Sequence, residues 1–218
     1  MIGDDLAQAL AQATGETAQM VFWSALLTLV LGLPLGVLLV ATDRGGLVPA
    51  PAVKAVLGAV VNVGRSLPFI VLMVAILPFT RLVTGTTIGT VAAIVPLTLG
   101  AVPFYARLVE TALRGVEREV VEAAQAMGAS RTRVVARVLL PEALPGLVAG
   151  LTVTIVALIG YSAMAGAIGG GGLGDLAIRY GYQRFDTTVM IVTVVLLIVV
   201  VQLVQSLGDL AARRLSHR

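Results

Sequence analysis

The chain has 218 residues, of which 58% are hydrophobic and only 12% are charged. Soluble domains carry about 25% charged residues, so this composition excludes an ordinary soluble protein and indicates an integral membrane protein. The absence of cysteine excludes disulfides and cysteine-based metal sites. The net charge of +3 does not indicate a nucleic-acid partner, because in a membrane protein the placement of the charges matters more than their sum.

The two ends of the chain are polar. Residues 1–17 include Asp4, Asp5 and Glu16 but no basic residue. A secretory signal peptide needs a positively charged start, so we expect the first apolar run to remain in the mature chain. At the other end, the single histidine, His217, is expected to be a solvated residue of the tail.

Five apolar runs of about 20 residues predict an all-α membrane protein with five transmembrane helices. The runs are continuously apolar rather than alternating, which argues against a β-barrel. The predicted spans cover residues 20–41, 55–79, 86–105, 146–168 and 188–208. Together they form one membrane domain, residues 18–208, which lies between an extracytoplasmic tail (residues 1–17) and a cytoplasmic tail (residues 209–218).

Basic residues are distributed unevenly about these spans. The segments that follow the first, third and fifth spans share one side of the membrane and hold 11 of the 15 basic residues. The other side has Arg81, Arg179, Arg184 and the acidic N-terminal tail. Because basic residues collect in cytoplasmic loops, we expect the N-terminus outside and the C-terminus in the cytoplasm.

Helix breakers lie within three of the predicted spans. A proline in a spanning helix frees a backbone carbonyl, which neighbouring helices or water must then satisfy. The pattern favours ordinary kinks in a packed bundle, and the alternative is that some kinks line or hinge a transport pathway. The breakers are Gly32, Pro34, Gly36, Pro68, Pro96 and Pro103.

The cytoplasmic segment at about residues 107–145 is much longer than a connection between neighbouring helices requires. Its first part has charges of alternating sign at spacings of three and four, from Arg107 to Arg118, which predicts a solvated helix face. Gly128 is expected to end this helix in the left-handed conformation. Ser130 is a candidate cap for a second short helix that Leu140 and Pro141 would end.

That short helix, residues 131–139, is predicted to be amphipathic. Val134, Val135, Val138 and Leu139 fall on one side, and the arginines Arg133 and Arg137 fall on the other. Such a helix can press its apolar side into a groove on a partner protein. It can equally lie on the lipid surface with its arginines toward the head groups. Periodicity alone does not separate these alternatives.

Residues 122–141 resemble the EAA loop of type I ABC importer permeases. That pattern is Glu-Ala-Ala, three residues, Gly, nine residues and Ile-x-Leu-Pro, and this chain follows it with Val138 in place of isoleucine. In that family the loop sits in a cleft of the ATPase subunit and transmits the closure of the ATPases to the permease helices. The resemblance implies coupling residues Glu122, Ala123, Ala124, Gly128, Arg131, Arg133, Val134, Arg137, Val138, Leu140 and Pro141.

Further motifs over nearly the whole chain resemble the methionine ABC transporter permeases, at residues 65–70, 78–81, 96–100, 160–166, 169–175 and 178–182. The resemblance implies a subunit of an ATP-driven methionine importer in the bacterial inner membrane. It also implies a second copy of the chain, two cytoplasmic ATP-binding subunits and an extracytoplasmic methionine-binding lipoprotein. Other neutral or hydrophobic amino acids, or oxidised methionine, are alternative substrates.

The sequence does not predict an enzyme. It has no Gly-x-x-x-x-Gly-Lys-[Ser/Thr] motif, so we expect ATP and magnesium on the partner ATPase and no cofactor on this chain. The glycines at residues 169–174 are expected in a flexible connection that permits close packing. Ser162 lacks a nearby base and is better interpreted as a small residue between packed helices.

A passive channel or secondary transporter is the remaining rival. Secondary carriers need ionisable groups within the membrane, and Arg65 has no predicted intramembrane carboxylate beside it. Arg65 either reaches the cytoplasmic boundary or faces the interior of the bundle near Ser66. Met164 is expected in the core, with a hydrophobic gate as the alternative. The pathway candidates are therefore Arg65, Ser66, Pro68, Ser162 and Met164.

Overall fold

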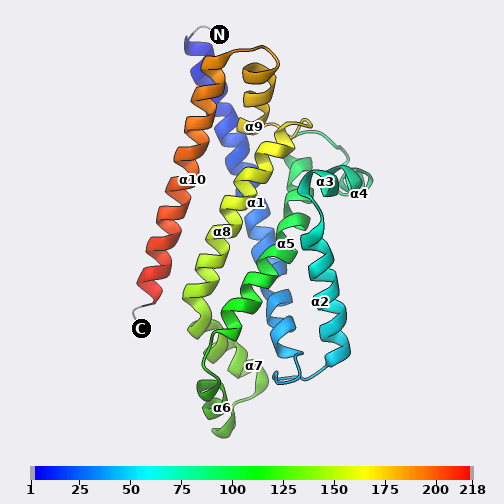
Figure 1. Ribbon diagram of the computed structural model, residues 1–218, viewed down its shortest axis with the longest axis vertical. Helices are drawn as coiled ribbons and strands as arrows, with labels where there is room; N and C mark the ends of the chain where they lie inside the picture. The colour runs from blue at the N-terminus through cyan, green and yellow to red at the C-terminus, as the bar shows by residue number, and fades with distance from the viewer. Residues whose placement is uncertain (1–2, 217–218) are drawn as a thin grey trace.

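The computed structural model describes residues 3–216, so His217 and Arg218 lie outside the described residues. The described chain is an elongated bundle of helices without a strand (Figure 1). Its long helices are α1 (Gly3–Ala41), α2 (Pro51–Ser66), α5 (Thr90–Arg114), α8 (Leu140–Gly166) and α10 (Thr187–Leu215). Short elements join them: α3 (Phe69–Ala75), α4 (Leu77–Thr84), α6 (Arg118–Ala126), α7 (Arg131–Val134), the π-helical turn η1 (Val135–Leu139), α9 (Gly172–Leu176) and the π-helical turn η2 (Ala177–Tyr182).

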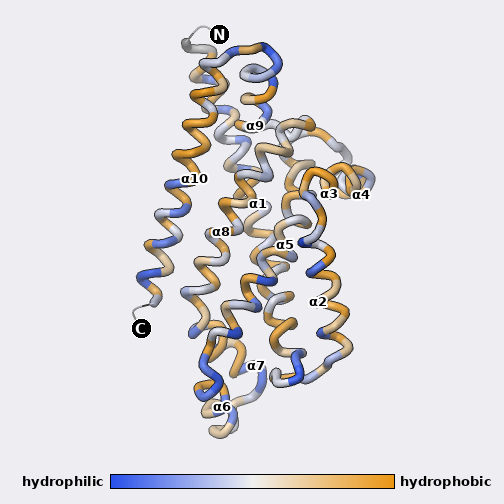
Figure 2. Tube along the Cα trace, in the orientation of Figure 1, coloured by the Kyte–Doolittle hydropathy of each residue, from blue (hydrophilic) through white to orange (hydrophobic). Residues whose placement is uncertain are grey.

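Four helices in the described part of the chain are long and apolar enough to cross a membrane, and the number is five if the bent pair of α2 and α3 counts as one span. Figure 2 shows mostly apolar shafts, with hydrophilic residues concentrated near α6 and α7, around the α9 end and toward the end of α10. Helix α1 begins beside α9, and α10 runs toward the α6 end of the bundle (Figure 1).

Several helices extend beyond the predicted spans. Residues 3–17, expected as a tail, continue α1 as one helix of 39 residues, roughly 58 Å long. This extension is held by α9, since Glu16 accepts a hydrogen bond from the Gly172 N–H (2.7 Å) and Thr17 accepts one from the Leu173 N–H (2.9 Å). Likewise, α5 continues to Arg114 and α10 to Leu215, so residues 209–215 are helical rather than a tail.

The second predicted span is broken at Pro68, one of the predicted helix breakers, rather than kinked in the ordinary way. Helix α2 ends at Ser66 and α3 turns away from it by 103°. Leu67 is extended (φ −79°, ψ 125°), as expected for a residue whose helical conformation is blocked by the ring of the following Pro68. Pro34, Pro96 and Pro103 instead lie inside continuous helices.

Two glycines of α1 allow that helix to approach α5 closely. A Cβ atom built on Gly36 would lie 2.5 Å from the Cβ of Val109, and one on Gly32 would lie 3.0 Å from the ring of Tyr105. Membrane helices use small residues in this way to bring backbones together. The role of Gly32 and Gly36 is therefore close packing rather than hinging.

We predict that Gly36→Ala lowers stability by about 1–3 kcal/mol, the usual cost of forcing extra atoms into a packed core. Gly15→Ala is the matched control, because Gly15 lies in the same helix and a Cβ atom added there would meet nothing within 4 Å. Thermal denaturation of the purified variants in detergent measures the difference. Equal melting temperatures for the two variants would contradict the packing role.

Candidate functional site

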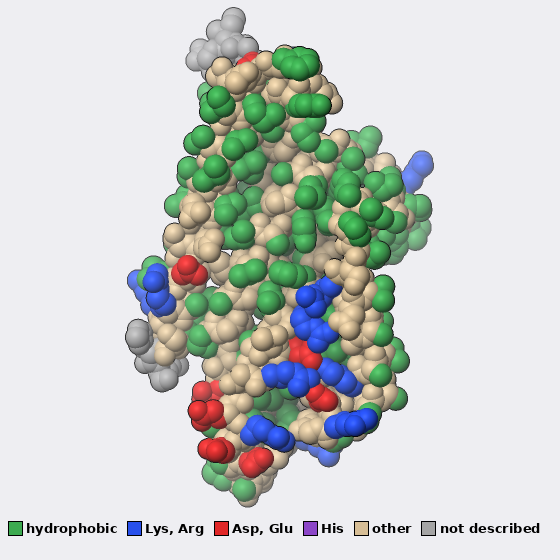
Figure 3. Space-filling model, viewed as in Figure 1, with side chains coloured by type: hydrophobic (Ala, Val, Ile, Leu, Met, Phe, Trp, Pro, Cys, Tyr) green, Lys and Arg blue, Asp and Glu red, His purple; other side chains and the backbone are tan. Residues whose placement is uncertain are grey.

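The candidate coupling segment, residues 118–141, forms one end of the molecule. It comprises α6, α7, η1 and the first residues of α8, and it protrudes below the apolar shafts (Figures 1 and 2). On the face shown in Figure 3, basic and acidic side chains gather over this half of the molecule, whereas the opposite half is largely hydrophobic. This charge distribution agrees with the cytoplasmic orientation expected from the sequence.

The turn between α6 and α7 is built around Gly128. Its φ of +80° is the left-handed conformation that glycine adopts readily, so the predicted helix-ending role is confirmed. The Gly128 N–H donates to the Gln125 carbonyl (2.9 Å), and the Ala129 N–H donates to the Ala124 carbonyl (3.1 Å). Ser130 occupies the cap position of α7, but its side chain makes no capping hydrogen bond.

The short helix does not end at Leu140 and Pro141, contrary to the sequence expectation. Residues Arg131–Gly166 form one helical segment that includes α7, η1 and α8. The Leu140 N–H donates to the Val135 carbonyl five residues back, which is the π-helical pattern. In a regular α-helix the ring of Pro141 would clash with the carbonyl of Arg137, and the wider turn accommodates it. The coupling segment is thus a direct extension of α8.

The apolar side of the short helix faces the protein's own core. Val134 is fully buried, and Leu139, which is 7% exposed, packs in a cluster that includes Leu113 and Leu147. Both sequence interpretations, in which this side met a partner or lipid, are therefore wrong. The periodicity correctly predicted which side of the short helix is apolar. That side packs against the core of the same chain.

The exposed surface of the coupling segment consists mostly of polar residues and residues with small side chains. The side chains of Arg131, Arg133 and Arg137 are exposed, and Met127 beside Gly128 is 82% exposed. Of the remaining motif residues, Glu122, Ala123 and Pro141 are exposed, Val138 and Leu140 are half-buried, and Ala124 is buried. A partner protein bound at this surface would therefore contact protruding basic side chains rather than an apolar face.

A cavity of about 500 Å³ lies behind the coupling segment. Its walls come from the end of α1, the loop that follows α1, the end of α5, and the inner side of α6 and η1. The inward side of α6 contributes Val121, Glu122 and Gln125. Helix α6 packs against α7 and η1, and the hollow lies between it and α1.

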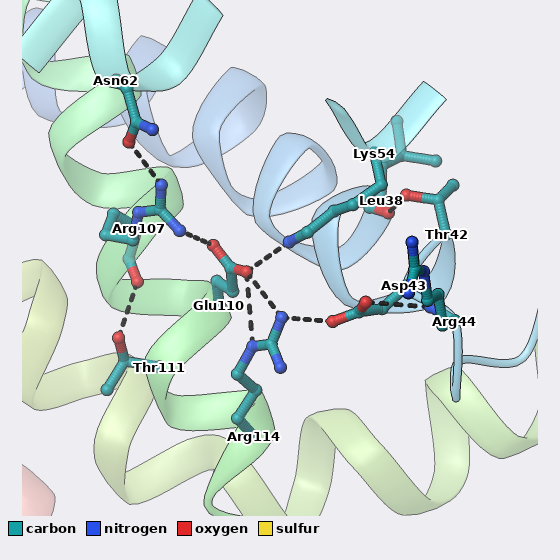
Figure 4. Close-up of polar contacts among 10 residues, drawn as sticks. All are labelled: Leu38, Thr42, Asp43, Arg44, Lys54, Asn62, Arg107, Glu110, Thr111 and Arg114. Carbon is teal, nitrogen blue, oxygen red and sulfur yellow. Dashed lines mark hydrogen bonds and ion pairs between the residues drawn. The ribbon is translucent and has the colours of Figure 1, made fainter. Parts of the chain in front are cut away.

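Next to this cavity, several basic side chains pair with one buried carboxylate. Glu110 of α5 is 3% exposed and accepts hydrogen bonds from Lys54, from Arg107 (2.5 Å) and from Arg114 (3.0 Å), as Figure 4 shows. Arg114 also pairs with Asp43 in the loop after α1, and Arg107 donates to Asn62 of α2 at 2.6 Å. This cluster of residues from three segments ties α2 and the α1 loop to α5.

The cluster corrects one sequence expectation. The alternating charges from Arg107 onward were expected on a solvated face, whereas Glu110 is buried and its partners include a residue of another helix, Lys54. Glu110 lies near the end of α5 that leads into the coupling segment, and it is fully paired there. Outside the span, the Arg44 backbone N–H and the Arg114 guanidinium hold the pKa of Asp43 below its ordinary 3.8, so that carboxylate is charged at neutral pH.

We predict that Glu110→Gln destabilises the protein by about 3–5 kcal/mol, because it leaves Lys54, Arg107 and Arg114 without their shared counter-charge. Glu119→Gln is the matched control: Glu119 is exposed on α6 and makes no ion pair with the described residues. Thermal denaturation in detergent is the measurement. Similar melting temperatures for the two variants would show that the cluster contributes little.

The structure separates the pathway candidates. Arg65, Ser66 and Pro68 lie together at the break after α2 and are exposed in the single chain. Ser162 of α8 is buried and donates to the Ile159 carbonyl at 2.8 Å, which agrees with a packing role. Met164 is 47% exposed, so its expected place in the core was wrong. Sequence reasoning missed Phe69, Phe104 and Tyr161, which line a recess with Arg65.

Comparisons with known proteins agree with this arrangement. The family model for the "binding-protein-dependent transport system inner membrane component" matches residues 32–217. The "Probable D-methionine transport system permease protein MetI" of Vibrio cholerae is 56% identical over 209 residues, which cover 96% of this chain and 93% of that protein. The "Methionine import system permease protein MetP" of Bacillus subtilis is 46% identical over 181 residues, or 83% and 82% of the two chains.

Solved structures show the same fold. A chain of the inward-facing MetNI methionine ABC transporter is 46% identical and superimposes with a TM-score of 0.97, covering 98% of this chain and 99% of that one. A chain of an amino acid ABC transporter solved with histidines has a TM-score of 0.79 at 17% identity, over 95% and 94% of the two chains. The second likeness concerns the fold alone.

Proposed function

The chain belongs to the family of binding-protein-dependent transport system inner membrane components, and we propose that it is the permease subunit of an ATP-driven methionine importer. Two copies enclose the route, and two cytoplasmic ATPase subunits bind ATP and magnesium. An extracytoplasmic methionine-binding lipoprotein delivers the substrate. The names of the relatives support the substrate, and the 46% identity to the MetNI chain over nearly the full length supports the ATPase partnership.

The proposed coupling mechanism depends on the uninterrupted helix from Arg131 to Gly166. The ATPases contact the exposed surface around Gly128, Arg131 and Arg133, and their closure displaces this surface. Because α7, η1 and α8 form one helical segment, the displacement passes into α8 without a flexible joint. The route then alternates between inward and outward opening as the two copies of α8 move. The chain itself contributes binding and transmission, and the ATPase subunits perform the hydrolysis.

The substrate assignment predicts ATP-dependent uptake of labelled methionine. The complete transporter, with its ATPase and binding protein, is reconstituted in lipid vesicles, and uptake is measured with L- and D-methionine. Leucine and methionine sulfoxide serve as competitors that represent the alternative substrates. Uptake without ATP at the same rate would indicate a channel or secondary carrier, and preference for leucine would overturn methionine as the substrate.

The coupling assignment predicts that Gly128→Trp uncouples ATP hydrolysis from uptake. We expect hydrolysis to continue while uptake falls by about tenfold or more, since coupling free energies between sites are typically about 1–3 kcal/mol. Uptake and phosphate release are measured in the same vesicles. Uptake at the normal rate would contradict the assignment of this turn to the ATPase contact.

Gly85→Trp is the matched control for backbone strain. Gly85 has a φ of +76°, close to the +80° of Gly128, and a Cβ atom added to either residue would meet nothing within 4 Å. Gly85 follows α4, far along the bundle from the coupling segment (Figure 1). Both substitutions strain a left-handed turn in the same way, so only a role specific to Gly128 explains a difference in coupling.

A further inference from the structure

A recess lies beside the break between α2 and α3, away from the coupling segment. Its volume is about 260 Å³, below the range of about 300–1,000 Å³ typical of sites for drug-sized ligands, which suits a single small solute. Helices α2, α3, α5 and α8 and the break between α2 and α3 all contribute to its walls. They supply Gly64, Arg65, Leu67, Phe69, Leu72, Gly100, Phe104 and Tyr161.

Arg65 is the charged group of this recess, and it has no counter-charge. Arg65 makes no hydrogen bond or ion pair with any described residue. In contrast, Lys54 in the first turn of α2 and Arg107 of α5 both pair with Glu110. A charged side chain within a membrane span is costly and is retained where it faces a cavity or a ligand. Because Arg65 lies on the wall of the recess, its guanidinium is placed to bind an anionic group there.

The remaining walls are apolar and aromatic. The rings of Phe69 and Tyr161 are stacked, with centroids 4.5 Å apart and an interplanar angle of 10°, and Phe104 lines the same recess. Gly100 keeps the wall free of a side chain at a point where a Cβ would lie 3.2 Å from the Phe69 ring. Aromatic rings bind aliphatic side chains, and thioether sulfur makes favourable contacts with their edges.

From this juxtaposition we propose that the recess is a binding site on the transport route for a zwitterionic amino acid with a neutral, apolar side chain. Arg65 binds the α-carboxylate, and Phe69, Phe104 and Tyr161 contact the side chain. The break at Leu67 and Pro68 gives the site its access, because the interrupted helix opens the wall of the bundle there. This inference rests on the proposed function, since it identifies where the chain itself holds the transported solute.

A photoreactive methionine with a diazirine in its side chain tests the site directly. The permease–ATPase complex in lipid nanodiscs is irradiated with this analogue, without the binding protein, and the labelled peptides are identified by mass spectrometry. We expect label on the peptides that carry Phe69, Phe104 or Tyr161. An excess of methionine should suppress it, whereas methionine amide, which lacks the carboxylate, should not.

Arg65→Gln should reduce this labelling by about tenfold, the effect of losing one hydrogen bond to a charged group. Arg81→Gln is the matched control, because Arg81 is also exposed and without a partner among the described residues, but does not line the recess. Label elsewhere in the chain, equal suppression by the amide, or unchanged labelling in Arg65→Gln would each overturn the proposal. If the Arg65→Gln transporter does not assemble, the proposal is still tested on the unsubstituted complex. The positions of the labelled peptides and the competition by methionine amide then decide whether the recess binds the amino acid.

The vesicle uptake experiment separates this inference from the proposed function. Failure of the unsubstituted transporter to import methionine overturns the proposed substrate. Normal methionine import together with label outside the recess overturns only the site.

Discussion

Lipid offers no hydrogen-bond partners, so each backbone N–H and C=O group within the membrane must be satisfied inside the protein. The prolines within the spans show two outcomes of that constraint, and Pro141, in the coupling segment, shows a third arrangement. Pro34, Pro96 and Pro103 remain inside continuous helices, and Pro68 breaks a span. Pro141 is accommodated by the π-helical turn η1, which keeps the chain helical between Arg131 and Gly166. That third arrangement creates the continuous helical connection on which the proposed mechanism depends.

Charges within the bundle obey the same constraint. Glu110 is buried, and three cations share it, so each member of the cluster has a partner. Arg65 is the contrasting case, since the described part of its own chain supplies no carboxylate and only the recess lies beside it. The two sites therefore have different roles. The Glu110 cluster holds α2 and the α1 loop against α5, whereas the guanidinium of Arg65 is available to bind a ligand.

The sequence predicted the elements whose signals are local. The length of each apolar run gave the number of spans, and a glycine between two helical patterns gave the left-handed turn at Gly128. The EAA motif predicted the candidate coupling segment, and its contact with an ATPase stays a prediction. Features that depend on contacts between distant residues were missed: the sequence does not show that α2 approaches α5, so Lys54 could not be assigned to Glu110. The burial of Val134 depends similarly on which core its helix meets, because periodicity shows that a face is apolar but not what covers it.

The distribution of contacts suggests which helices move together. Helix α5 is held to α2 and to the α1 loop by the Glu110 cluster, and α1 is held to α5 by close packing at Gly32 and Gly36. The coupling segment is instead joined to α8 through η1, with the cavity of about 500 Å³ separating α6 from the end of α1. A force on the exposed turn at Gly128 therefore meets a continuous helix in the direction of α8 and the cavity in the direction of the end of α1. Helix α8 also carries Tyr161, which contacts Phe69 across the recess, so a displacement of α8 would alter the recess that Arg65 lines.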